Sequence, residues 1–179
     1  SRGAHIAFRL AETYPDRVRG LVLAEPSGVL DESLSPPSAT PASYTAFIAD
    51  AVERIRHGDI EEGLRSFYEY AVGAGSWDRL SEERQQLNRD NARTLLGQIN
   101  EGRKPYSRAS AEAIRAPTLL VGGALTRPAF VTVLEGLERA IPAVHRVSIP
   151  DAGHPMFREN PAVFNRAVLE FLRPVASAI

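Results

Sequence analysis

Two residues near opposite ends of this 179-residue chain, Ser1 and His154, are of the types that act together in nucleophilic catalysis. A serine hydroxyl becomes reactive only when a base takes its proton and hydrogen-bond donors hold the oxyanion that forms. Histidine is the usual base, and a carboxylate usually orients it. Such residues come from distant positions of a chain, so a fold that joins them predicts acyl-transfer chemistry.

The context of Ser1 is that of the second half of a nucleophile elbow, G-x-S-x-G, without its first glycine. The backbone N–H of Arg2 is expected to supply one oxyanion donor at the positive end of a helix. Gly3 is expected to allow the following strand close to the helix start. The motif alone is common, and the alternative role for Ser1 is a helix N-cap. Because the chain starts on this serine and not on Met, we expect the upstream half of the site to lie outside it.

The elements that must position these residues follow from hydrophobic periodicity. A helix is predicted over 3–14, and Pro15 lies where it should stop. Short apolar runs at 18–24, 117–122 and 144–149 predict buried parallel strands, with a helix over 129–141 between the last two. A final helix is predicted from Pro161 to Pro174. The order of strands and helices indicates an α/β fold with three parallel strands.

Residues 31–112 differ in pattern. A Pro- and Ser-rich stretch at 35–41 predicts a linker, and three helices are expected at about 42–56, 59–73 and 80–101. The prediction is therefore a core of residues 1–30 and 113–179, interrupted by a helical cap at 31–112. Most aromatic side chains of the cap lie at helical spacing and are expected to pack within it.

Several segments together resemble the α/β-hydrolase superfamily: S-R-G-A-x-I-A-x-R-L-A and Y-P-D-R-V-R-G-L-V-L-A-E-P at the start, A-P-T-L-L-V-G-G in the middle, and P-D-A-G-H-P-M with E-N-P-x-x-F-N near the end. The resemblance covers essentially the whole chain. It implies the C-terminal part of an α/β-hydrolase fold with an inserted helical cap. By position it implies that Ser1 is the nucleophile and His154 the general base.

The triad acid departs from the commonest family pattern. An Asp is expected shortly after strand 117–122, but residues 123–128 contain no carboxylate. Some members take the acid from the end of the strand after the nucleophile helix, which here is Glu25. The alternatives are that Glu25 is a structural carboxylate bonded to loop amides, that Asp151 is the acid although it is expected to shape a turn, or that a dyad works without an acid.

The other histidines, His5, His57 and His145, match no catalytic position. His5 lies one turn after Ser1 and is expected to be a packed helix residue, with lining of the site as the alternative. Metal and cofactor sites are not indicated, because the histidines lack zinc-helix spacing and the glycine pairs lack a phosphate-loop pattern.

The composition of the chain limits the classes of binding partner that are expected. A net charge of −1 gives no excess of positive charge for nucleic acid or a membrane surface, and no apolar run approaches the length of a bilayer span. The absence of cysteine excludes thiol nucleophiles and disulfides. A small-molecule substrate is expected, with a cytoplasmic location as the default, and the oligomeric state is left open.

These observations together predict a serine hydrolase that acts on a carboxylic ester of a small apolar molecule. The 179-residue segment by itself is expected to be inactive. The alternatives are a catalytically silent hydrolase-fold protein that binds a small molecule as a receptor, and a plain interaction domain.

Overall fold

The computed structural model describes residues 1–35 and 44–177, with the backbone alone at 44–47 and 176–177. The chain divides into two compact units. The sheet unit comprises residues 1–40 and 104–179, and the helical unit comprises residues 41–103. Within the described ranges, no helix is both long and apolar enough to cross a membrane.

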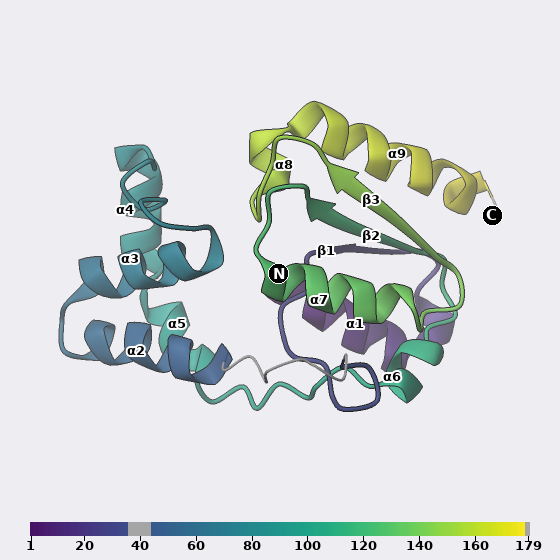
Figure 1. The fold of residues 1–179 in the computed structure, drawn as a ribbon, viewed down its shortest axis with the longest axis horizontal. Coiled ribbons are helices and arrows are strands. Elements are labelled where there is room, and N and C mark those ends of the chain that lie inside the picture. The colour runs from purple at the N-terminus through teal and green to yellow at the C-terminus, as the bar shows by residue number, and fades with distance from the viewer. Residues whose placement is uncertain (36–43, 178–179) are drawn as a thin grey trace. The chain divides into compact units, whose positions relative to one another are not determined.

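The sheet unit is built on three parallel strands in the order β1-β2-β3 (Figure 1). They are β1 Leu21–Ala24, β2 Thr118–Gly123 and β3 Val144–Ile149. The register places Ala24 beside Val121 and Gly123 beside Ile149. Every residue of β2 is buried, as expected for the middle strand of a sheet covered on both faces. The carboxyl ends of the three strands therefore form one edge of the sheet.

Helices cover both faces of this sheet (Figure 1). Helices α1 Arg2–Thr13 and α7 Pro128–Glu138 lie on one face, and α9 Pro161–Ser177 lies on the other. Alternate residues of β2 contribute to the two cores, since Leu120 packs with the α1 and α7 side chains and Leu119 packs with the α9 side chains. The short helices α6 Arg108–Glu112 and α8 Met156–Glu159 contribute Ala111 and Met156 to these cores.

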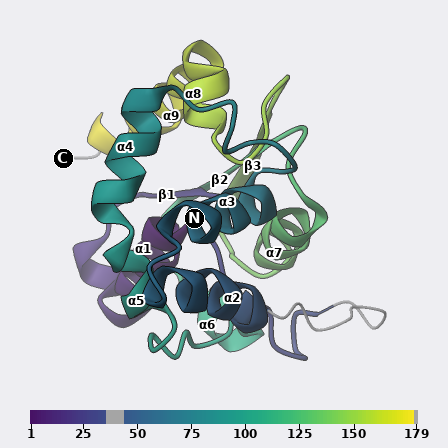
Figure 2. The same cartoon turned by 90° about the vertical axis from the view of Figure 1, so that its left-hand side faces the viewer.

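The helical unit contains α2 Tyr44–Arg56, α3 Ile60–Ala71, α4 Glu82–Asn91 and α5 Arg93–Gln98. Helices α2 and α3 pack side by side (Figure 2). A Cβ at Gly63 would clash with Ile55, so this glycine permits their close approach. The unit has its own core around Trp77, which is 0% exposed and packs with Val52, Leu64 and Leu95.

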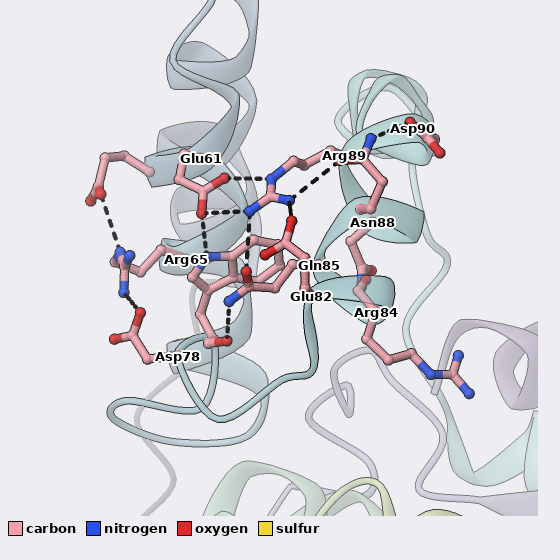
Figure 3. A network of polar contacts seen from close by, with 12 residues as sticks. Glu61, Arg65, Asp78, Glu82, Arg84, Gln85, Asn88, Arg89 and Asp90 are labelled. Carbon is pink, nitrogen blue, oxygen red and sulfur yellow. Dashed lines mark hydrogen bonds and ion pairs between the residues drawn. The ribbon is translucent and has the colours of Figure 1, made fainter.

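A polar network joins the elements of the helical unit (Figure 3). Glu61 accepts hydrogen bonds from the Trp77 indole N–H at 2.8 Å and from Arg89 Nε at 2.8 Å. Arg89 also pairs with Glu82 at 2.7 Å. The hydrogen bond from Arg89 lowers the pKa of Glu61 below its ordinary value of 4.5, and the Trp77 hydrogen bond acts in the same direction, against the effect of burial. The network connects α3, the loop around Trp77 and α4.

Some predicted boundaries differ from the observed ones. Strand β1 begins at Leu21 and not at Val18, because residues 15–17 form a 3₁₀ turn and the ladder starts where the Leu21 N–H reaches the Pro117 carbonyl. The helix expected over 80–101 breaks at Ala92, where i→i+3 hydrogen bonds replace the α-helical pattern. Helix α9 continues past Pro174, which lies in its last turn.

The helical unit, residues 41–103, is also shorter than the expected cap of 31–112. Leu34 and Ala111 are buried in the core of the sheet unit, and Leu30 pairs with Tyr106 in a parallel bridge. Residues 31–35 and 104–112 therefore belong to the sheet unit. The linker expected at 35–41 lies, apart from Ser35, outside the described residues.

Candidate active site

His154 and Glu25 are in direct contact at the carboxyl edge of the sheet. His154 Nδ1 lies 2.5 Å from Glu25 Oε2, although the two residues are far apart in the sequence. A carboxylate can only accept, so Nδ1 carries the hydrogen and Nε2 is left as the basic nitrogen. The Glu25 side chain is 0% exposed and that of His154 is 16% exposed. The pair is thus a shielded, charge-assisted hydrogen bond with one side of the histidine near solvent.

Glu25 is held in an unusual backbone conformation directly after β1. Its φ of 39° lies in the left-handed region, which is unfavourable for a side chain with a Cβ. Strain of this kind persists only where the surroundings impose it, and it is concentrated at functional sites. The sharp turn directs the carboxylate toward the ends of β2 and β3 instead of along its own strand.

Two further donors reach the same carboxylate. The Gly123 N–H donates to Glu25 Oε1 at 2.8 Å, and the Thr126 hydroxyl donates to Oε2 at 2.8 Å. Glu25 therefore makes both the loop-amide contact of the structural alternative and the histidine contact of the catalytic one. Asp151, the other candidate acid, lies in the turn after β3 with a φ of 55°.

The loop that carries His154 is packed closely against the end of β2. A Cβ at Gly123 would collide with the backbone carbonyls of Ala152 and Gly153, so only glycine fits there. The Glu159 carboxylate, from α8, accepts the Gly153 N–H at 2.6 Å and fixes the residue before the histidine. The ring of Phe130, from α7, stacks on the imidazole ring of His154, with ring centroids 4.1 Å apart and ring planes 13° from parallel.

Ser1 lies at the same edge of the sheet, beside Glu25. Its amino group donates to the Ala24 carbonyl at 2.7 Å, and its carbonyl accepts the Ser27 N–H at 3.3 Å. Ser1 occupies the N-cap position of α1, but its side chain accepts no capping hydrogen bond from the described residues of that helix. The geometry thus removes the main argument for the N-cap alternative. Ser1 therefore lies against the end of β1 that leads into Glu25, and Glu25 in turn contacts His154.

Arg2 and Gly3, the two residues after Ser1, differ in how they compare with the expectations from sequence. Arg2 is the first residue of α1, where a backbone N–H is not used by the helix itself. The expected close approach at Gly3 is wrong within the described residues, since a Cβ there would meet nothing within 4 Å. The glycine is not required for packing of the helix start against β1.

His5 is a packed residue, as expected, and it takes part in a hydrogen-bonded cluster. The Tyr106 hydroxyl donates to the Ser27 carbonyl at 3.0 Å and lies 2.8 Å from His5 Nδ1, which must then donate to it. Tyr106 is 0% exposed and lies in the segment that returns from the helical unit. The cluster fixes helix α1 to the loop that follows Glu25.

The remaining histidines lie on the surface. His57 lies in the turn after α2 and contacts Glu53 of that helix, and His145 is exposed on β3. No group of His, Asp and Glu within the described ranges has the arrangement of a metal site.

Sequence reasoning missed three residues of this region: Thr126, Phe130 and Tyr106. Their contacts come from loop hydroxyls and ring stacking, which leave no periodic signal. One clue was present for Thr126, because it lies in the segment where an acid was expected and a hydroxyl stands in its place.

Comparison with known proteins identifies the family of the fold. The model of the alpha/beta hydrolase fold family matches residues 1–161. A Bacillus subtilis (strain 168) protein named "Putative 2-succinyl-6-hydroxy-2,4-cyclohexadiene-1-carboxylate synthase" is 27% identical over 192 residues, which cover 98% of this chain and 64% of that protein. The chain therefore spans less than two thirds of the length of this relative.

Solved structures of other proteins also match the fold of this chain. A thermophilic esterase from Thermogutta terrifontis is 27% identical with a TM-score of 0.69, and the match covers 98% of this chain and 63% of that one. MGS-M2, an alpha/beta hydrolase enzyme from a deep-sea metagenome library, is 20% identical with a TM-score of 0.74 over 96% of this chain and 62% of that one. The order of the strands, the helices on both faces and the family match lead to one conclusion: this chain belongs to the alpha/beta hydrolase fold family.

Proposed function

We propose that the protein carrying this chain is a serine hydrolase that cleaves a carboxylic ester of a small apolar molecule, with Ser1 as nucleophile, His154 as general base and Glu25 as the acid that orients it. The observation that supports this most strongly is the 2.5 Å contact between His154 Nδ1 and the buried Glu25 carboxylate. That contact leaves Nε2 as the acceptor that a serine proton requires. The 27% identity to an esterase is consistent with the reaction class.

In the proposed reaction, Ser1 Oγ attacks the ester carbonyl carbon while His154 Nε2 takes the hydroxyl proton. The oxyanion is stabilised by donors that include the Arg2 N–H. His154 then gives its proton to the leaving alkoxide, which departs as the alcohol and leaves an acyl-Ser1 ester. Water attacks this ester with His154 as base again, and the carboxylic acid is released. Residues 41–103 would act as a helical cap that selects the substrate.

The missing acid after Gly123 favours the receptor alternative, but the carboxylate that Glu25 presents to His154 from the neighbouring strand end supports the hydrolase proposal. A second candidate reaction is favoured by the 27% identical relative, whose name describes a synthase and not a hydrolase. Assays with p-nitrophenyl esters should therefore be accompanied by a test of whether the protein forms the cyclohexadiene carboxylate of that name, which is the product of a synthase and not its substrate.

A fluorophosphonate probe tests the nucleophile without knowledge of the substrate. We expect labelling at Ser1, none in Ser1→Ala, and a loss in His154→Ala of several orders of magnitude. Hydrolysis of p-nitrophenyl butyrate should fall in parallel, and by roughly 10⁴-fold in kcat for Glu25→Gln. His57→Ala is the matched control, because His57 is an exposed histidine of the helical unit, and it should keep the wild-type rate. Equal labelling of wild type and Ser1→Ala would exclude the proposal.

A further inference from the structure

Residues 123–126, which comprise the end of β2 and the loop after it, hydrogen-bond to Glu25 and to the segment that precedes His154. The first and last of its four donors reach the Glu25 carboxylate, and the middle two reach backbone carbonyls of the segment that precedes His154. The donor and acceptor pairs are Gly123 N–H to Glu25 Oε1 at 2.8 Å, Ala124 N–H to Ile149 O at 2.9 Å, Leu125 N–H to Ala152 O at 2.8 Å and Thr126 Oγ1 to Glu25 Oε2 at 2.8 Å.

We infer that Thr126 is a positioning residue of the site, which holds the Glu25 carboxylate in the orientation that receives the proton-bearing nitrogen of His154. Thr126 acts through Glu25 and is not itself a reacting group. The inference rests on the proposed function, because it assigns a role within the same site.

The geometry of a carboxylate explains why one donor is insufficient. The terminal torsion of a glutamate is broad and soft, so a single hydrogen bond to Oε1 lets the group rotate about that contact. A second donor on Oε2 fixes the plane of the carboxylate. Thr126 supplies that donor to the same oxygen that His154 contacts. The two donors, Gly123 N–H and Thr126 Oγ1, thus fix both the position and the plane of the Glu25 carboxylate that accepts the His154 hydrogen bond.

The same loop also sets the distance between the partners. Ala124 and Leu125 anchor it to the end of β3 and to the turn before His154. A movement of residues 123–126 would therefore displace Glu25 and His154 together, and their hydrogen bond would be retained. If Thr126 were only a structural residue of the turn, its loss would lower stability and leave the rate unchanged. If Thr126 positions Glu25, its loss should lower the rate.

The variant Thr126→Val deletes the hydroxyl and preserves the shape. We expect the rate of fluorophosphonate labelling at Ser1, and kcat for p-nitrophenyl butyrate, to fall about tenfold with little change in KM. Thr126→Ser should restore most of the rate. The matched control is Thr132→Val, since Thr132 is a partly exposed threonine of α7 whose hydroxyl donates to the Pro128 carbonyl at 3.0 Å, and it should keep the wild-type rate.

A double-mutant cycle separates positioning from stability. In a Glu25→Gln background, Thr126→Val should have no further effect on the rate, because the group it positions has been changed. Wild-type labelling in Thr126→Val, or a full additional tenfold loss in the Glu25→Gln background, would overturn the inference while the Ser1 and His154 variants still test the reaction itself.

A proton NMR measurement remains decisive if the protein proves inactive. The His154 Nδ1 proton in its short hydrogen bond to Glu25 should resonate far downfield. Thr126→Val should shift or broaden this signal, Thr126→Ser should largely preserve it, and an identical signal in Thr126→Val would contradict the inference.

Discussion

At the level of single residues, the Tyr106 hydroxyl joins helix α1 to the loop after Glu25, so we expect its removal to destabilise the sheet unit. Tyr106→Phe keeps the ring and leaves the Ser27 carbonyl and the His5 Nδ1 proton without this partner in a region where Tyr106 is 0% exposed. We expect a loss of about 1–3 kcal/mol in the free energy of unfolding, measured by urea denaturation with far-UV circular dichroism.

Tyr68→Phe provides the matched control for this substitution. The Tyr68 hydroxyl donates to Asn88 Oδ1 at 3.0 Å in a partly buried position of the helical unit, where water can replace it. Its cost should be clearly smaller than that of Tyr106→Phe. Equal costs would mean that the buried cluster around Tyr106 has no special weight.

The sequence offers candidates for the reacting groups of the site, but it does not indicate the residues that hold them in place. Ser1, Glu25 and His154 are candidates through the family resemblance, and the structure brings Glu25 and His154 into contact at one edge of the sheet. Thr126 and Tyr106 could not be predicted, since a hydrogen bond from a hydroxyl depends on ångström-scale loop geometry that residue type does not determine.

At the level of elements, the contact between the end of β2 and the His154 loop is the least tolerant of change. Gly123→Ala would force a Cβ into the carbonyls of Ala152 and Gly153, which are backbone atoms and cannot rotate away. We expect a destabilisation of roughly 2–4 kcal/mol and a loss of Ser1 labelling. The thermal unfolding temperature and the labelling rate measure the two effects.

Gly97→Ala is the corresponding control in a helix. A Cβ at this exposed position of α5 would meet nothing within 4 Å, so the change should stabilise by about 0.5–1 kcal/mol through helix propensity. A similar destabilisation in both variants would show that the contact at Gly123 is not the cause.

Among the elements themselves, those with a full apolar period could be predicted and the short ones could not. Strand β3 begins and ends as expected, and α1 agrees to within one residue. The helices α6 and α8 span 5 and 4 residues, which is too short for a 3.6-residue period to emerge. The break at Ala92 follows from packing, since Ala92 and Leu95 both turn into the core around Trp77.

At the level of the whole molecule, the helical unit should have its own dependence on pH. The lowered pKa of Glu61 means that its carboxylate stabilises the folded state fully above its ordinary value of 4.5, and that this contribution is lost as the pH falls through the lower folded value. Glu61→Gln should therefore cost roughly 0.5–1 kcal/mol at pH 7 and much less at pH 3.

Trp77 makes this measurement specific, because it is the only tryptophan of the chain and lies in the core of the helical unit. The urea midpoint followed by Trp77 fluorescence should show the difference between wild type and Glu61→Gln at pH 7 and a smaller difference at pH 3. Glu53→Gln changes exposed contacts with Arg56 at 3.9 Å and with His57 at 3.4 Å, and it should alter neither midpoint. A constant gap between wild type and Glu61→Gln at both pH values would refute the assignment.

The bridge between Leu30 and Tyr106 has a consequence for modularity. The chain leaves the sheet unit and returns to it through two segments that are already hydrogen-bonded to each other, with Asp31 N–H to Tyr106 O and Tyr106 N–H to Val29 O, both at 2.9 Å. Everything between these segments is an insertion closed at its base. An exchange of the sequence between Ser35 and Lys104 would leave these hydrogen bonds in place, and we expect the sheet unit to accept a different insertion at this point.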